Sequence, residues 1–140
     1  MREILFKAKR KDNGEWVEGF YEKKIEWHRL SEGRYAKAET HYICVNMVSS
    51  EDSYIDRIIV VPETICQYTG LTDKNGNKIW ENDIVLDSEE REVYKMVWSQ
   101  DSMRYCVEKA SGFDYEFDSS YASSIEVIGN IFDNPELIGA

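Results

Sequence analysis

Hydrophobic and polar positions in this chain alternate over short stretches, and no 3.6-residue apolar period is sustained over three turns. Alternation with a period of two is typical of β-strands that bury one face. We therefore expect an all-β protein with only short helical turns. The predicted strands in the first half are Ile4–Ala8, Trp16–Tyr21, His41–Met47 and Ile55–Val61. Those in the second half are Lys78–Leu86, Glu92–Trp98, Met103–Lys109, Phe113–Phe117 and Ile125–Ile131.

Turn signals separate these stretches. The strongest is Asp73–Gly76, because Asn75 and Gly76 tolerate the positive φ that a tight hairpin needs. Weaker signals predict a turn at Lys11–Gly14 and a loop at Ser31–Gly33.

Two short helical turns are expected. Pro62, followed by an acidic residue, begins one that Gly70 ends, and Asn134–Leu137 forms a closing turn. The five strands that follow the first of these turns recur about every 8–12 residues, which is typical of a sandwich or barrel. We expect an N-terminal β region over residues 1–62 and a barrel region over residues 63–140, within one compact unit.

Composition supports a single folded chain. Of 140 residues, 42% are hydrophobic and 13% aromatic, and only two are proline, so a flexible linker is not expected. No apolar run approaches the roughly 20 residues that span a bilayer. Charges interrupt the N-terminus where a signal peptide would be apolar. We expect a cytoplasmic protein of a bacterial host cell, with no membrane contact.

The net charge of −10 lies entirely in the second half. Residues 1–62 hold 11 Lys or Arg against 11 Asp or Glu, whereas residues 63–140 hold 6 against 16. Nucleic-acid binding needs a dense basic patch. The basic cluster in the first eleven residues is too small for that, so no direct nucleic-acid contact is expected.

The cysteines are Cys44, Cys66 and Cys106, an odd number without a Cys-x-x-Cys pair. In a reducing compartment such cysteines are most simply small buried hydrophobes. The alternative is a reactive Cys106, since Arg104 lies two residues before it and a basic neighbour lowers a thiol pKa.

Metal and cofactor sites are not expected. Asp73–Glu81 places oxygen side chains as a calcium loop does, but it has Lys78 where an EF-hand needs glycine. His28 and His41 are the only histidines and do not have zinc-ligand spacing.

Glu81, Asp83 and Asp87 follow one another at even spacing and would share one face of a regular strand. Paired carboxylates can act as general acid and base in a hydrolase. The simpler interpretation, which we favour, is the solvent face of an amphipathic strand with Trp80 and Ile84 facing inward.

Phe113–Asp118 alternates three aromatic residues with Asp114, Glu116 and Asp118. One interpretation is an edge strand with aromatics facing the core and an outer face charged against aggregation. The other is an acidic ridge presented to a basic partner protein, which makes these three carboxylates candidate partner-binding residues.

Several segments together resemble the YopX-like phage and prophage proteins, a family without an assigned activity. These segments are Met1–Ala8, Trp16–Phe20, Pro62–Gly70, Gln67–Leu86 and Val127–Ile138. Asn82 stands where the family pattern leads us to expect glycine, and residues 22–56 match nothing in it. The resemblance implies a small, mostly β protein of phage origin with a partly open SH3-like barrel, and it implies no reaction.

Three functions follow as hypotheses. The first is a non-enzymatic phage accessory protein that acts through protein contacts and self-associates as a homo-oligomer. The second is an acidic nucleic-acid mimic that occupies a basic protein. The third and weakest is a hydrolase that uses the carboxylates near Asp83 or a Cys106 nucleophile.

Overall fold

The computed structural model describes residues 2–139, so Met1, where the family-like opening segment begins, lies outside the described residues. The chain folds as two compact units. The N-terminal unit is Ile4–Ile65, and the C-terminal unit comprises the described residues from Cys66 onward together with Arg2 and Glu3.

The N-terminal unit is an antiparallel sheet in the order β4-β3-β2-β1. Its strands are β1 (Phe6–Lys9), β2 (Trp16–Ser31), β3 (Arg34–Val48) and β4 (Ser53–Ile59), and a 3-10 helix, η1 (Pro62–Thr64), follows them. Strand β2 pairs with β1 as far as Gly19 and with β3 from Phe20 onward.

Strand β3 changes partner along its length. Its first part pairs with β2 as far as Cys44, and its last part pairs with β4 from Tyr42 onward. These pairings overlap only at residues 42–44, so β3 has a partner on both sides over just three residues. Beyond this overlap the sheet continues as two separate two-stranded ribbons.

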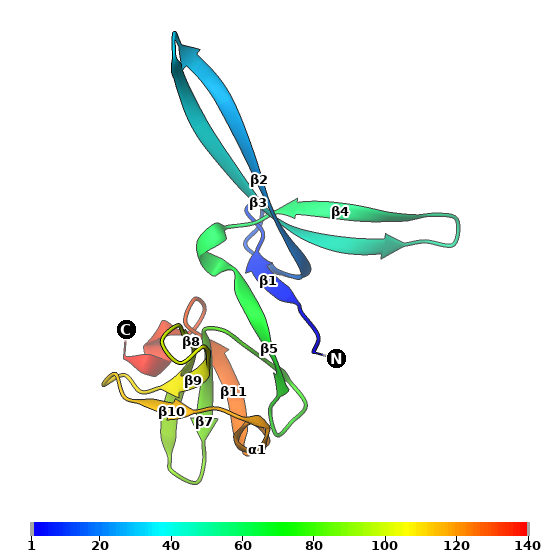
Figure 1. The fold of residues 1–140 in the computed structure, drawn as a ribbon. Helices are drawn as coiled ribbons and strands as arrows, with labels where there is room; N and C mark the ends of the chain where they lie inside the picture. The colour runs from blue at the N-terminus through cyan, green and yellow to red at the C-terminus, as the bar shows by residue number, and fades with distance from the viewer. Residues whose placement is uncertain (1, 140) are drawn as a thin grey trace. The chain divides into compact units, whose positions relative to one another are not determined.

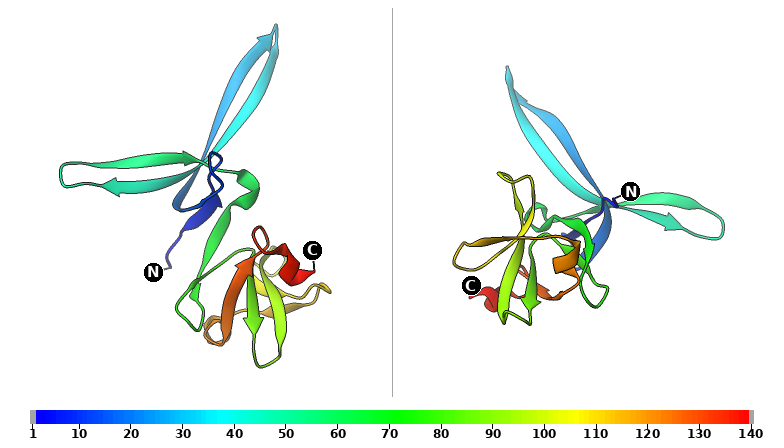
Figure 2. Two further views of the ribbon diagram at one scale, coloured as in Figure 1. Left: turned by 180° about the vertical axis from the view of Figure 1, so that it is seen from behind. Right: turned by 60° about the horizontal axis from the view of Figure 1, so that its bottom comes forward.

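We call residues 23–41 the long arm and residues 45–56 the short arm. Figures 1 and 2 show the two ribbons leaving the overlap in different directions. The long arm turns at the predicted loop, where Gly33 has φ 69°. The short arm turns at Ser49, whose N–H donates to the Asp52 carbonyl.

The core of the N-terminal unit lies at the overlap. Ala8, Ile43 and Val60 are buried there, with Phe6 and Tyr21 among the partly buried side chains packed around them. Gly19 allows β2 to cross closely at this point, since a Cβ there would lie 2.3 Å from the Cys44 carbonyl oxygen.

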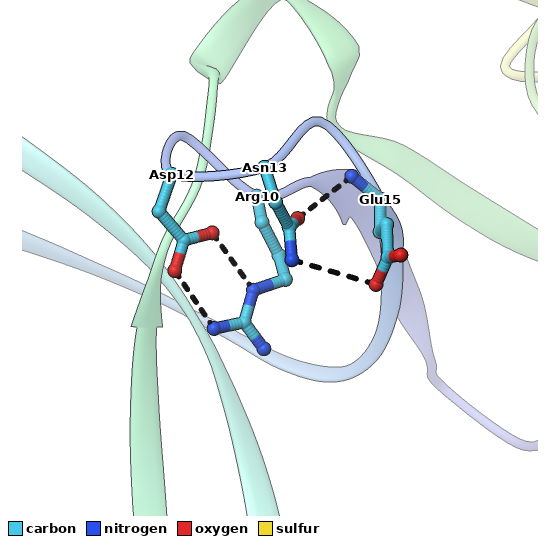
Figure 3. Close-up of polar contacts among 4 residues, drawn as sticks. All are labelled: Arg10, Asp12, Asn13 and Glu15. Atoms are coloured by element: carbon cyan, nitrogen blue, oxygen red, sulfur yellow. Dashed lines mark hydrogen bonds and ion pairs between the residues drawn. The ribbon is translucent and has the colours of Figure 1, made fainter.

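The β1–β2 turn is held by its own side chains (Figure 3). The Arg10 guanidinium donates two hydrogen bonds to the Asp12 carboxylate, at 3.0 and 2.9 Å, and Asn13 Oδ1 accepts from the Glu15 N–H at 2.9 Å. This confirms the predicted turn at Lys11–Gly14, where Gly14 has φ 75°.

The C-terminal unit contains a five-stranded antiparallel sheet in the order β10-β9-β8-β7-β11. Its strands are β7 (Asp83–Asp87), β8 (Glu92–Ser99), β9 (Arg104–Glu108), β10 (Asp114–Glu116) and β11 (Ile125–Asn130). The chain runs through four neighbouring strands, and β11 then returns to pair with β7. Strands β10 and β11 are the two edges and do not pair, so the sheet is open and does not close into a barrel.

A hairpin and two short helices complete this unit: β5 (Cys66–Thr72), β6 (Lys78–Trp80), α1 (Ser119–Ala122) and the 3-10 helix η2 (Pro135–Ile138). The buried core contains Ile79, Val85, Met96, Val107 and Ile125. The structure confirms the predicted fold class, which is mainly β with short helical turns.

Three element predictions were wrong in detail. The helical turn from Pro62 ends at Thr64, and Gly70 instead lies within β5 with φ 91°. The predicted strand Lys78–Leu86 is divided into β6 and β7 by a turn in which Asn82 has φ 68°. Strand β2 continues ten residues past the predicted end at Tyr21, to Ser31. Within residues 2–139 no helix is both long and apolar enough to cross a membrane.

Candidate functional site

The carboxylates proposed for acid–base chemistry are turned inward. Asp83 is 2% exposed and Asp87 6% exposed, so the predicted solvent face was wrong for both. Asp83 accepts a hydrogen bond from the Trp80 N–H at 2.8 Å. The burial is possible because local donors compensate each charge.

Asp87 and Glu81, like Asp83, accept hydrogen bonds from nearby groups of the fold. Asp87 accepts from the Tyr121 hydroxyl at 2.9 Å and from the N–H groups of Glu89 and Glu90. Glu81 accepts from the Gln67 N–H at 2.6 Å, and burial raises the pKa of its carboxyl. Among the described residues no buried side-chain nitrogen or oxygen lacks a hydrogen-bond partner.

All three cysteines are buried, as predicted. Burial raises the pKa of Cys106, and Asp114 and Glu108 raise it further, against a lowering by Arg104. Cys44 donates to Glu22 at 3.3 Å, and burial raises its pKa as well. Because the thiolate is the nucleophile, these surroundings oppose thiol reactivity.

The segment that resembles a calcium loop is the predicted hairpin turn. Asp73 Oδ1 accepts from the N–H groups of Asn75 and Asn77, both at 2.9 Å, and Gly76 takes φ 81°. Asn75, which we expected to share the positive φ, does not. Within residues 2–139 no group of three or more His, Cys, Asp or Glu is placed to hold a metal ion.

The acidic segment forms the edge strand β10 and the start of α1. Glu116 pairs with Arg104 at 3.2 Å, and Asp118 caps α1 by accepting from the Tyr121 N–H at 2.8 Å. Asp114 is exposed. Phe117 packs against the core, but Phe113 is 69% and Tyr115 47% exposed, so the predicted inward orientation was wrong for these two residues.

Three tyrosines from separate elements line a cavity of about 440 Å³ in the C-terminal unit, which we call the tyrosine cavity. They are Tyr94 on β8, Tyr115 on β10 and Tyr121 on α1. Burial first, and then the hydrogen bond to Asp87, raises the pKa of the Tyr121 hydroxyl. No spacing in the sequence could reveal this cavity, because the fold alone brings the three elements together.

The long arm presents three large hydrophobic side chains to solvent on a face that also carries Arg29, Lys37 and Glu39. The register places Ile25, Trp27 and Tyr35 on one face, because Trp27 pairs with Lys37 and Arg29 with Tyr35. Trp27 is 65% exposed and Tyr35 61% exposed. The opposite face is polar there and includes a Lys24–Glu26 ion pair of 2.9 Å. Alternation from Lys23 to Trp27 was a signal for this face, although the strand was predicted to stop at Tyr21.

A second hollow, of about 390 Å³, lies beside the β1–β2 turn in the N-terminal unit and is lined in part by Arg10, Asp12 and Arg57. The Arg10 guanidinium in it already pairs with Asp12, as Figure 3 shows. Arg57 likewise pairs with Glu22 at 3.0 Å. Both arginines of this hollow therefore neutralise neighbouring carboxylates.

The open five-stranded sheet of one unit and the antiparallel sheet of the other define a mostly β protein. The YopX protein family matches residues 5–139, and the chain belongs to this family. The crystal structure of protein EF1440 from Enterococcus faecalis is similar over 99% of both chains, with a TM-score of 0.60 and 23% identity, which shows a shared fold. No curated protein matches the chain.

Proposed function

We propose that this protein is a non-catalytic phage accessory protein that acts through protein contacts and self-associates through the face of the long arm that carries Ile25, Trp27 and Tyr35. One observation carries the proposal: a two-stranded ribbon holds Ile25, Trp27 and Tyr35 on one solvent-exposed face. A two-stranded hairpin is marginally stable alone in water. Covering that face with protein would stabilise the ribbon by about 25 cal/mol for each Å² of apolar surface removed from water.

Charge favours a second copy of the chain as the covering partner. Residues 23–41 hold five Lys or Arg against three Glu, so the net charge of the long arm is small and two long arms approach each other with little net repulsion. Residues 63–140 hold 6 against 16, so contact between two such acidic surfaces would be repulsive. A two-fold axis through paired arms would let each Trp27 and Tyr35 pack against the equivalent patch of the other chain.

The non-catalytic part of the proposal is supported by the hydrogen bonds and the burial of the candidate reactive groups. Asp83 and Asp87 accept hydrogen bonds that hold local turns and a helix, and burial raises the pKa of the Cys106 thiol. A general base must be able to reach a substrate proton. Asp83 and Asp87 face inward, and their burial opposes such access.

Size-exclusion chromatography with light scattering tests the self-association. The wild-type chain is expected to elute as an oligomer at low and high salt, because apolar contacts resist screening. The double substitution Trp27→Ser with Tyr35→Ser is expected to give a monomer.

Phe113→Ser is the matched control, because it removes an exposed aromatic outside the arm, and it is expected to remain an oligomer. A monomeric wild type at micromolar concentration would contradict the proposal, as would equal dissociation of both variants.

A further inference from the structure

The tyrosine cavity has the walls of a cation-binding site. The rings of Tyr94 and Tyr115 meet edge to face, with centroids 5.7 Å apart and planes 73° apart, so they form a corner. Tyr121 lines the same cavity from α1. Each ring face carries negative electrostatic potential that attracts an ammonium or guanidinium group within about 6 Å.

The chain already places one of its own cations against this wall. Lys109 Nζ lies 5.7 Å from the centroid of the Tyr115 ring and 3.3 Å from a carboxylate oxygen of Glu92. Lys109 lines the cavity, yet about 440 Å³ remains open. The cavity therefore accommodates an ammonium group at one side and has room for another.

The remaining polar lining supplies compensating negative charge. Glu89 and Glu90 are exposed at the cavity, and the buried Asp87 carboxylate fixes the Tyr121 ring through its hydroxyl. Three carboxylates against one lysine leave a negative lining, which would repel an anionic ligand and attract a cationic one. The aromatic walls add selectivity for a cation attached to an apolar stem.

We propose that the tyrosine cavity binds an alkyl ammonium or guanidinium group, of the kind found on a lysine or arginine side chain or on a free small amine. This site lies wholly within the C-terminal unit and does not depend on self-association of the long arm. An acidic chain with such a cavity would bind one basic side chain of a partner specifically. Its acidic surface would attract the rest of that partner more weakly and in a salt-sensitive way.

Titration of the full chain with n-butylammonium chloride, followed by NMR of the tyrosine rings, tests the proposal. Saturable shifts at Tyr94, Tyr115 and Tyr121 are expected with n-butylammonium and not with n-butanol, which has the same stem without the charge. Absence of saturable shifts, or equal shifts with both compounds, would overturn the proposal.

A capped Gly-Lys-Gly peptide separates the two sources of the cation. Tighter binding of the peptide than of n-butylammonium would support recognition of a protein side chain. Equal or weaker binding of the peptide would support recognition of a free amine.

Two pairs of matched variants locate the site. Tyr115→Ala is expected to weaken n-butylammonium binding about 3- to 30-fold, whereas Phe113→Ala on the same segment is not. Glu90→Gln is expected to weaken it by roughly two- to five-fold, whereas Glu116→Gln, which removes the same charge outside the cavity, is not. Equal weakening by both members of either pair would overturn the assignment to this cavity.

Lys109→Gln is expected to change the affinity for n-butylammonium in the opposite direction from Tyr115→Ala and Glu90→Gln. Removing this lysine vacates the cation position over Tyr115 and leaves the carboxylates in place, so n-butylammonium is expected to bind more tightly. Weaker binding to Lys109→Gln would contradict a site in which the ligand and Lys109 compete for the same ring.

Discussion

Asp73 Oδ2 accepts a hydrogen bond from the backbone N–H of Val127 at 2.9 Å, although the two residues are 54 positions apart. The other oxygen of the same carboxylate accepts from the N–H groups of Asn75 and Asn77. One buried side chain therefore both shapes the β5–β6 turn and attaches it to β11. This dual role explains why an aspartate at this turn is a structural requirement and not only a good turn former.

Asp73→Ala is expected to lower the free energy of unfolding by about 2–3 kcal/mol, because it leaves buried backbone donors without an acceptor. Urea denaturation followed by circular dichroism measures the change. Asp101→Ala, an exposed aspartate in another turn, is the control and is expected to have little effect. Equal stability of Asp73→Ala and wild type would contradict the role assigned to Asp73.

The stabilisation by Asp73 is expected to depend on pH. Burial acts to raise the pKa of its carboxyl, but the backbone N–H groups of Val127, Asn77 and Asn75 together hold that pKa below its ordinary value. A lowered pKa in the folded state means that the stabilisation is complete above the pKa of the unfolded chain, at about pH 4. It is lost as the pH falls through the lower, folded-state pKa.

Urea midpoints of wild type and Asp73→Ala between pH 7 and pH 2 test this. The difference between the two proteins is expected to be constant above about pH 4 and to shrink below it. A difference that grows on acidification would show the opposite sign of linkage.

Asn82 is expected to tolerate glycine better than alanine. Its φ of 68° lies in the left-handed region, which glycine adopts without the strain that a Cβ causes. Both substitutions remove the contact of Asn82 Nδ2 with Cys66 Sγ at 3.7 Å, so their comparison isolates the backbone effect. Thermal unfolding should find Asn82→Ala less stable than Asn82→Gly by about 1 kcal/mol. The reverse order would contradict this explanation.

Gly19→Ala is expected to destabilise the N-terminal unit. The new Cβ would lie 2.3 Å from the Cys44 carbonyl oxygen and 3.0 Å from Ile43 Cγ2, so the strands must separate where the core lies. Overpacking of this kind costs about 1–3 kcal/mol. Hydrogen exchange of the β2 and β3 amides measures the loss of protection, and Glu18→Ala, at an exposed neighbouring position, is the control.

Much of the C-terminal unit could be predicted from the sequence, because its turns carry strong local signals. Asn75-Gly76 marks the hairpin, and alternating residues mark β8, β9 and β11. The inward turn of Asp83 could not be predicted from alternation. It depends on the break at Asn82 and on the Trp80 N–H, which bonds the carboxylate after the chain has turned.

The long arm was missed for a different reason. From Glu22 to Thr40 the two faces carry charged residues almost continuously, so no core-facing pattern stands out. Alternation alone places Ile25 and Trp27 on one face, and the cross-strand register adds Tyr35 to it. The acidic residues Asp114, Glu116 and Asp118 were visible as candidates, whereas the tyrosine cavity beside them depends on the packing of three elements that are far apart in the sequence.

The three-residue overlap on β3 also bears on how this fold tolerates insertions and deletions. A ribbon lengthens or shortens at its tip by whole cross-strand pairs, and neither change touches Ile43 or the strands around it. Adding or removing two cross-strand pairs keeps each of the other residues on its side of the ribbon, since side chains alternate along a strand. The reach of each arm can therefore be adjusted in steps without remodelling the small core from which it extends.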